Sequence, residues 1–144
     1  MYLSAIEDLY NREIIAYKIS DSLDISFVLQ TLGEAFKKVN SKELNNLIIH
    51  SDQGVHYKSN IYKSILKKYG IKQSMSRKGN CYDNACIENF FGHLKTELIY
   101  QNSYSCREDL FNSINDYIHW YNNERFQSNL KNMTPVEYRC HMVS

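Results

Sequence analysis

The 144-residue sequence contains no long apolar run, no low-complexity tract, no internal repeat and only one proline. The missing apolar run excludes a membrane-spanning helix, which needs about 20 such residues, and no secretory leader pattern is present. The four cysteines form no C-x-x-C pair, and the five histidines have no zinc-ligand spacing with them. These absences argue against a structural zinc site and predict reduced thiols in a cytoplasmic protein.

Net charge is also nearly absent, because the 17 Lys and Arg residues are almost balanced by 16 Asp and Glu residues, which leaves +1. Such a balance does not by itself indicate a protein that binds nucleic acid. The charge is unevenly distributed, however, since the segment from Lys58 to Lys78 holds seven Lys or Arg and no acidic residue. A run of this kind is either a solvated face or a functional basic surface.

The apolar pattern predicts one α/β domain over residues 1–144. Its regions are a strand hairpin over 1–22, a βαβ region with a further long helix over 24–99, and C-terminal helices over 105–144. In the middle region, "NNLIIHSD" and "IKQSMS" read as strands on either side of a helix that Gly70 ends. Strand, helix and strand with short connections indicate a parallel pair.

The helix predicted over residues 84–99 carries two stripes. Its apolar stripe, which predicts the buried face, consists of Ile87, Phe90, Phe91, Leu94 and Leu98. A second stripe, Asn84, Glu88, Gly92 and Lys95, runs beside it, so Glu88 is expected at the edge of the buried face. Taken alone, Glu88 reads as a surface carboxylate that supports the first helical turn, and Gly92 clears space for the close approach of a ligand.

Asp52 changes the balance between these interpretations of Glu88. It stands where a predicted parallel strand ends, which is the edge at which open α/β sheets bind ligands. The flanking "HSDQGVHY" is rich in hydrogen-bonding groups, and thirty-five residues separate Asp52 from Glu88. These features favour a ligand-binding role for the two carboxylates over a purely structural role for Glu88.

Three blocks of the chain carry a family resemblance: "HSDQGVHY", "SRKGNCYDNACIENFFGHLKTE" and "YIHWYNNERFQSNLKNMTPVEYR". Together they resemble the catalytic core of bacterial insertion-sequence transposases, retroviral-integrase-like enzymes with an Asp, Asp, Glu triad. The resemblance covers essentially the whole chain. It implies an RNase H-like fold with a mixed central sheet flanked by helices, and DNA cleavage and strand transfer as the activity.

The resemblance also implies roles for individual residues. Asp52 matches the second acid of the triad and Glu88 the third, which makes both catalytic and ligands of Mg²⁺, with Mn²⁺ as a substitute. Lys95 falls where the family places a basic residue facing the terminal nucleotides, and Asn84 belongs to the same block. Together with these two, the expected contacts to the DNA backbone come from Lys72, Arg77 and Lys78.

The first acid of the family lies on a strand just before the segment that here starts at Met1. We therefore expect a core without its first strand and first carboxylate, with impaired turnover. Asp8, near the hairpin, is expected to be a turn residue that caps backbone amides rather than a metal ligand.

The expected partners are element ends, target DNA, and a second copy or an intact transposase, in the bacterial cytoplasm near the nucleoid. Two alternatives remain open: a catalytically dead fragment that binds DNA or dimerises and so modulates an intact transposase, and a nuclease for RNA–DNA hybrids.

Overall fold

The computed structural model describes residues 1–143, apart from the side chains of Cys81, Met142 and Val143. The strands are β1 (Tyr2–Glu7), β2 (Ile14–Ser20), β3 (Ile48–Ser51) and β4 (Lys72–Met75). The α-helices are α1 (Ile25–Lys37), α2 (Val55–Lys58), α3 (Asn60–Lys68), α4 (Ala85–Leu94), α5 (Arg107–Asn123) and α6 (Pro135–Val143). Shorter turns are the 3₁₀ segments η1 (Leu44–Asn46), η2 (Cys81–Asn84) and η4 (Ser128–Leu130), and the π-helical segment η3 (Lys95–Ile99).

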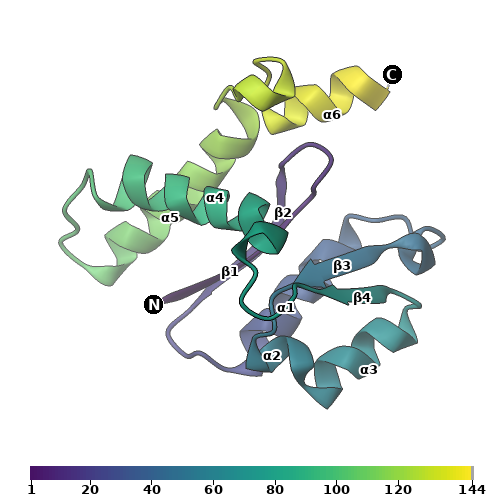
Figure 1. Ribbon diagram of the computed structural model, residues 1–144. Helices are drawn as coiled ribbons and strands as arrows, with labels where there is room; N and C mark the ends of the chain where they lie inside the picture. Colours follow the sequence, from purple (N-terminus) through teal and green to yellow (C-terminus); the bar gives the residue numbers. More distant parts are fainter. Residues whose placement is uncertain (144) are drawn as a thin grey trace. The chain divides into compact units, whose positions relative to one another are not determined.

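The chain divides into two compact units, and Figure 1 shows the helices and strands of which they consist. The first unit consists of Met1–Ile6 and Ile15–Ala85, and the second consists of Glu7–Ile14 and the chain from Cys86 onward. The hairpin of β1 and β2 therefore contributes its arms mainly to the first unit and its tip to the second.

The strands confirm the α/β class and correct the expectation of one mixed sheet. Within residues 1–143 they form two separate two-stranded sheets, β1 with β2 and β3 with β4. The β3–β4 pair is parallel, as predicted from the strand–helix–strand pattern. The single sheet is not formed because one continuous sheet needs a strand that hydrogen-bonds to both pairs, and none of the described strands does so.

The first unit is built around an apolar core between helices and the parallel pair. Asp24 caps α1, since its Oδ1 accepts a hydrogen bond from the Ser26 amide at 2.9 Å. Gly70 ends the α3 region with a positive φ of 70°, a conformation that glycine adopts without strain. The core cluster comprises Phe27, Val28, Leu32, Leu44, Tyr62, Leu66 and Ile71.

The second unit packs α4 against α5 through aromatic contacts. Phe90 is fully buried and Leu94 nearly so, which confirms the centre of the predicted apolar stripe. The ring of Phe90 meets that of Tyr121 edge-on, with centroids 5.1 Å apart. From α5 the buried side chains are Ile114, Tyr117, Ile118 and Tyr121.

The hairpin tip is joined to α5 and α6 by polar side chains of the same unit. Asn122 accepts from the Ile14 amide at 2.9 Å and donates to the Ile14 carbonyl at 3.0 Å, so it takes the place of a neighbouring strand. Asp8 is a turn residue as expected, because its Oδ1 accepts from the Tyr10 amide at 2.9 Å. At the start of α6, Thr134 and Glu137 form a reciprocal capping box.

Two expectations drawn from absences concern membranes and cysteines. Across the described residues, no helix combines the length and apolarity that crossing a bilayer requires. Cys86, Cys106 and Cys140 are free thiols, and the side chain of Cys81 lies outside the described part.

Glu7 is a buried carboxylate of the second unit with an incomplete set of hydrogen bonds. Its side chain is 3% exposed, its Oε1 lies 3.9 Å from Arg12 Nη1, and its Oε2 finds no hydrogen-bond partner in the described residues. Burial raises the pKa of Glu7 from 4.5 to about 7, with Arg12 opposing the rise and Asp8 adding to it. Between pH 4.5 and about 7, the Glu7 carboxyl is therefore protonated in the folded protein but ionised in the unfolded chain.

This proton makes stability fall as pH rises from 4.5 to about 7, with no further loss from Glu7 above that range. Glu7→Gln should therefore unfold with a free energy about 1–3 kcal/mol above that of the wild type at pH 8, and about equal to it at pH 4. Urea unfolding at both pH values measures the difference, with Glu43→Gln, an exposed glutamate of the other unit, as the control. A Glu7→Gln variant no more stable than wild type at pH 8 would contradict the assignment.

Candidate functional site

The parallel pairing of β3 and β4 brings their carboxyl ends to one edge of the first unit. In the observed register Ser51 lies opposite Met75, and the Ser76 amide donates to the Ser51 carbonyl at 2.8 Å. The next residue after β3 is Asp52, so its side chain is presented at the strand end as predicted. This edge is where parallel sheets bind ligands.

The carboxylate of Asp52 is exposed and oriented by its own loop. Its Oδ1 accepts a hydrogen bond from the Gly54 amide at 2.7 Å. A Cβ on Gly54 would lie 2.8 Å from that oxygen and 3.2 Å from the Tyr57 ring, so only glycine fits without displacement. Burial, and then the nearby charge of Asp52, raise the pKa of Tyr57.

Asn84 is held at the same edge by Ser76, the residue after β4. Its Nδ2 donates to Ser76 Oγ at 3.0 Å, and Gln53 Nε2 donates to the Ser76 carbonyl at 3.2 Å. Ser76 is 4% exposed. Asn84 therefore fastens the end of the loop after β4 to the strand end, which gives a structural reason for its place in the motif.

Three of the four basic residues predicted to contact DNA lie in the first unit, and their surroundings differ. Arg77 forms a two-pronged ion pair with Asp83, with Nη2 to Oδ1 at 3.1 Å and Nε to Oδ2 at 3.2 Å. Hydrogen bonding from Arg77 lowers the pKa of Asp83. Lys72 and Lys78 are exposed and form no salt bridge within residues 1–143.

The remaining predicted residues lie in the second unit, on α4 and just after it. Glu88 is exposed in the first turn of α4, which confirms that it lies outside the core. Gly92 is exposed, and a Cβ there would meet nothing within 4 Å. Lys95 is exposed and begins the π-helical segment η3.

The π-helical segment is stabilised by Glu97, a residue that the sequence pattern did not single out. Arg125 donates to Glu97 Oε1 from Nη2 at 2.6 Å and to Oε2 from Nε at 3.0 Å. The Tyr117 hydroxyl donates to the same Oε2 at 2.7 Å. Burial would raise the pKa of Glu97, but these hydrogen bonds outweigh it and lower that pKa.

The side chain of Arg125 makes its contacts within the protein. Its guanidinium lies 5.5 Å from the centre of the Tyr121 ring in addition to its contacts with Glu97. Arg125 follows Glu97 by 28 positions in the sequence, so no local pattern could have revealed the pair.

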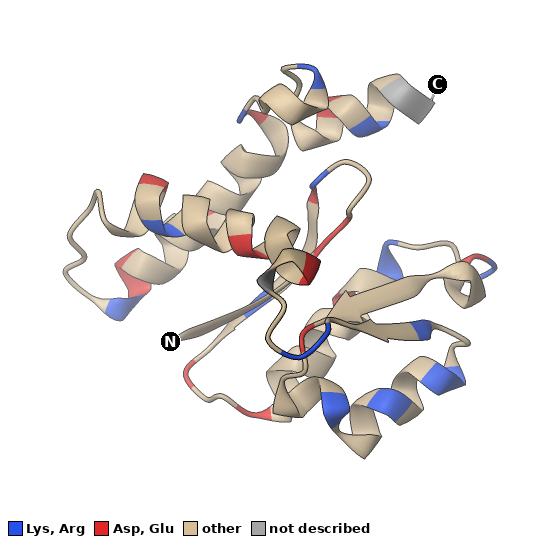
Figure 2. Ribbon diagram, in the orientation of Figure 1, with Lys and Arg blue, Asp and Glu red and all other residues tan. Residues whose placement is uncertain are grey.

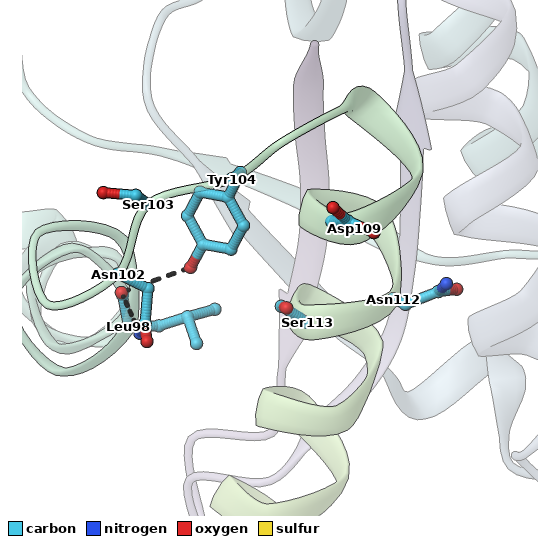
Figure 3. A pocket seen from close by; sticks show the side chains of 7 residues that line it. All are labelled: Leu98, Asn102, Ser103, Tyr104, Asp109, Asn112 and Ser113. Atoms are coloured by element: carbon cyan, nitrogen blue, oxygen red, sulfur yellow. Dashed lines mark hydrogen bonds between the residues drawn. The ribbon is translucent and has the colours of Figure 1, made fainter.

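A polar pocket of about 450 Å³ lies between the loop after η3 and the start of α5 (Figure 3). The hydroxyl of Tyr104 and Nδ2 of Asn102 both donate to the Leu98 carbonyl. Its lining residues are Leu98, Asn102, Ser103, Tyr104, Asp109, Asn112 and Ser113. None of the predicted site residues lines it.

The described residues contain no group of three or more His, Cys, Asp or Glu side chains that could hold a metal. Asp52 and Glu88 are nevertheless suitable as individual ligands, because each offers exposed carboxylate oxygens of the kind that Mg²⁺ takes. His50 has another partner, since its Nδ1 lies 2.9 Å from Ser74 Oγ on the neighbouring strand.

The structure thus gathers part of the predicted set in each unit. Asp52 and Asn84 both lie at the strand-end edge of the first unit, where Asn84 is bonded to Ser76. Arg77 and Lys78 lie in the loop that follows β4. Lys72 lies at the opposite end of β4, away from Asp52. Glu88 and Lys95 share a face of the second unit.

A parallel strand pair with a carboxylate at its end defines an α/β protein with a polar ligand-binding edge. Comparison with known families adds that the integrase core domain matches residues 1–81 and again residues 88–143. The chain belongs to the integrase core domain family.

Three relatives illustrate the range of similarity. InsK of insertion sequence element IS150 from Escherichia coli K12 is 47% identical over 96% of this chain and 48% of its own length. An uncharacterized transposase-like protein from Haemophilus influenzae is 45% identical over 100% of this chain and 65% of its own length. The transposase for insertion sequence element IS904 from Lactococcus lactis is 35% identical over 96% and 54%. The chain spans about half to two thirds of these relatives.

Gly54→Ala should turn the Asp52 carboxylate away from its present position. The added Cβ would lie 2.8 Å from Oδ1 and disturb the hydrogen bond to the residue 54 amide, at a cost of about 1 kcal/mol. Urea unfolding and the NMR shifts of Asp52 measure the effect. Gly33→Ala is the matched control, because a Cβ at Gly33 meets nothing within 4 Å. Identical behaviour of the two variants would show that Gly54 does not orient Asp52.

Glu97→Gln should destabilise the second unit by about 1 kcal/mol at pH 7, a modest value because the pair is partly exposed. Since the pKa of Glu97 is lowered in the folded state, its contribution is present above the unfolded value of 4.5 and fades as pH falls through the folded value. Thermal melts at pH 7 and pH 3 measure this. Glu108→Gln, at the exposed start of α5, is the control, and a deficit as large at pH 3 would refute the ion-pair explanation.

Proposed function

We propose that this chain acts in DNA transposition, as the part of a longer protein that cuts phosphodiester bonds and joins the cut strand to new DNA. The proposal is supported chiefly by the exposed Asp52 carboxylate, which Gly54 orients at the end of a parallel strand. Its relatives include the transposase for IS904, of which the chain covers 54%. Transposition is therefore proposed for the whole protein, with this chain contributing its catalytic core.

Asp52 and Glu88 are the proposed catalytic residues and the proposed ligands of Mg²⁺, for which Mn²⁺ can substitute. When bound, such ions stabilise the attacking and leaving oxygens of an in-line displacement at phosphorus. In cleavage, a water oxygen bonds to phosphorus while the bond to the 3′ oxygen breaks, and that oxygen leaves as a hydroxyl. In strand transfer, this hydroxyl oxygen bonds to a target phosphorus and releases the target's 3′ oxygen, which takes up the proton.

The resemblance assigns no residue of this chain to the first acid of the triad, so turnover by the 144-residue chain alone is proposed to be impaired. Asp8 does not replace that acid, because its carboxylate caps the hairpin turn. The alternative is a catalytically dead fragment that binds DNA or dimerises and so modulates an intact transposase.

Basic and polar groups would hold the DNA around the two carboxylates. Lys95 shares the outer face of the α4 helix with Glu88, which suits a contact to the terminal nucleotides. Lys72 and Lys78 are exposed and would bind phosphates by charge. Arg77 would first have to leave Asp83, whereas Asn84 would support the strand end.

The proposed partners are the ends of the mobile element, the target DNA, and a second copy of the chain or an intact transposase. Because its substrate is chromosomal DNA, the proposed location is the cytoplasm, in association with the nucleoid.

A nicking assay with labelled element-end DNA and Mn²⁺ tests the proposal. Wild-type chain should give slow nicking, and Asp52→Asn and Glu88→Gln should each lower it by about 100-fold or more, because each removes a metal-binding charge. Glu43→Gln is the control for loss of an exposed carboxylate. Binding of DNA that is equal with and without metal, with no nicking, would favour the dead fragment. Cutting of RNA–DNA hybrids without any need for element ends would favour the hybrid nuclease.

A further inference from the structure

One segment of the first unit contains several cations and no acidic residue. Residues 53–82 hold seven Lys or Arg and no acidic residue, whereas the rest of the chain holds ten Lys or Arg and all sixteen Asp and Glu. Helix α3 carries much of this charge, and Figure 2 shows blue positions along it and no red ones. The overall charge of +1 conceals this separation.

The two sides of α3 differ sharply in character. Tyr62 and Leu66 are buried in the core cluster of the first unit. The opposite side presents an exposed outer stripe, spaced three and four residues apart, that consists of Asn60, Lys63, Ser64 and Lys67. All four residues are polar, two of them are cations, and none is acidic.

The lysines of the stripe have no carboxylate partner, in contrast to four of the chain's arginines. Lys63 and Lys67 form no salt bridge within residues 1–143, and neither does the neighbouring Lys68. The paired arginines are Arg12 with Glu7, Arg77 with Asp83, Arg125 with Glu97 and Arg139 with Glu13. The lysines of the stripe can therefore bind an external anion without first breaking an ion pair within the protein.

Helix stability accounts for only part of the stripe. Lysines in a last turn interact favourably with the helix dipole, which explains Lys67 and Lys68. Lys63 is the fourth of nine residues, so the dipole gives it no such role. Its placement four residues before Lys67 sets two like charges side by side, which weakens a helix.

We infer that the outer stripe of α3 is a second DNA-binding surface, which holds the phosphate backbone of duplex DNA without reading its sequence. Lys63 and Lys67 supply the charge and Asn60 supplies an amide donor, which is the usual composition of a backbone contact. The Ser64 hydroxyl donates to the Ile61 carbonyl at 2.9 Å, so Ser64 adds a small polar surface between the two lysines. This inference rests on the proposed function for the identity of the nucleic acid. None of the residues assigned there to DNA contact belongs to the stripe.

The stripe fits a nucleic-acid backbone better than a lipid surface. A helix that lies on a membrane inserts a continuous apolar face. In α3 the buried Tyr62 and Leu66 face the core of its own unit, and the half-exposed Ile61 stands between polar residues. Apart from the stripe, lysines at the end of α2 and the start of β4, Lys58 and Lys72, extend the positive charge along the same segment.

The test is binding of a labelled 30-base-pair duplex to the 144-residue chain, followed by fluorescence anisotropy from about 50 to 200 mM salt with EDTA present. Lys63→Gln/Lys67→Gln should bind about tenfold more weakly at the lower salt, and the slope of log affinity against log salt should shrink by about 2. The control, Lys38→Gln/Lys42→Gln, removes the same charge from exposed positions of the same unit. Lys63→Arg/Lys67→Arg should restore binding because it keeps the charge.

An unchanged salt slope in the stripe variant, or an equal loss in the control, would overturn the inference. Tighter binding of RNA of the same sequence would overturn the choice of DNA. Because the assay contains no divalent metal and scores no cleavage, it is independent of the nicking test. Weaker binding by the stripe variant without any nicking by wild type would support this surface and count against the proposed function.

Discussion

The register of β3 against β4 is the constraint from which the candidate site follows. Because Ser51 lies opposite Met75, the residues that follow each strand emerge side by side, and Ser76 can bond to the end of β3. Asp52 is thereby exposed at an edge whose backbone is already hydrogen-bonded, and Asn84 is fastened to the same edge through Ser76. A slip of one residue would turn every side chain of the strand to the other face.

In the second unit, one side of the helix α4 is packed while the other side stays exposed. Phe90 and Leu94 bury one side of α4 against α5, leaving Glu88 and Gly92 in solvent. Further along the chain, Glu97 accepts hydrogen bonds from both Tyr117 and Arg125. These bonds connect the end of the helix to α5 and to the residues that follow α5. Charge-assisted bonds of this geometry are stronger than neutral ones.

Local chemistry sufficed to predict most elements and the position of Asp52. Gly70 ends a helix and Asp8 caps a turn through contacts within a few residues, which is why their roles could be predicted from the sequence. The pairing of the strands into two sheets, the four-residue α2 and the π-helical turn could not be predicted, because they depend on contacts across the fold. The partners of Asn84 and Arg125 were hidden for the same reason.

The wide turn of η3 shapes the chain that follows it. A π-helical segment pairs its backbone groups one residue further along, as Tyr100 does with Lys95. In its last turn the Leu98 carbonyl accepts from the Gln101 amide and from the side chains of Asn102 and Tyr104. The loop is therefore bound to the last turn of the helix that precedes it. Variation elsewhere in this loop can be absorbed there, without disturbing the surface that carries Glu88.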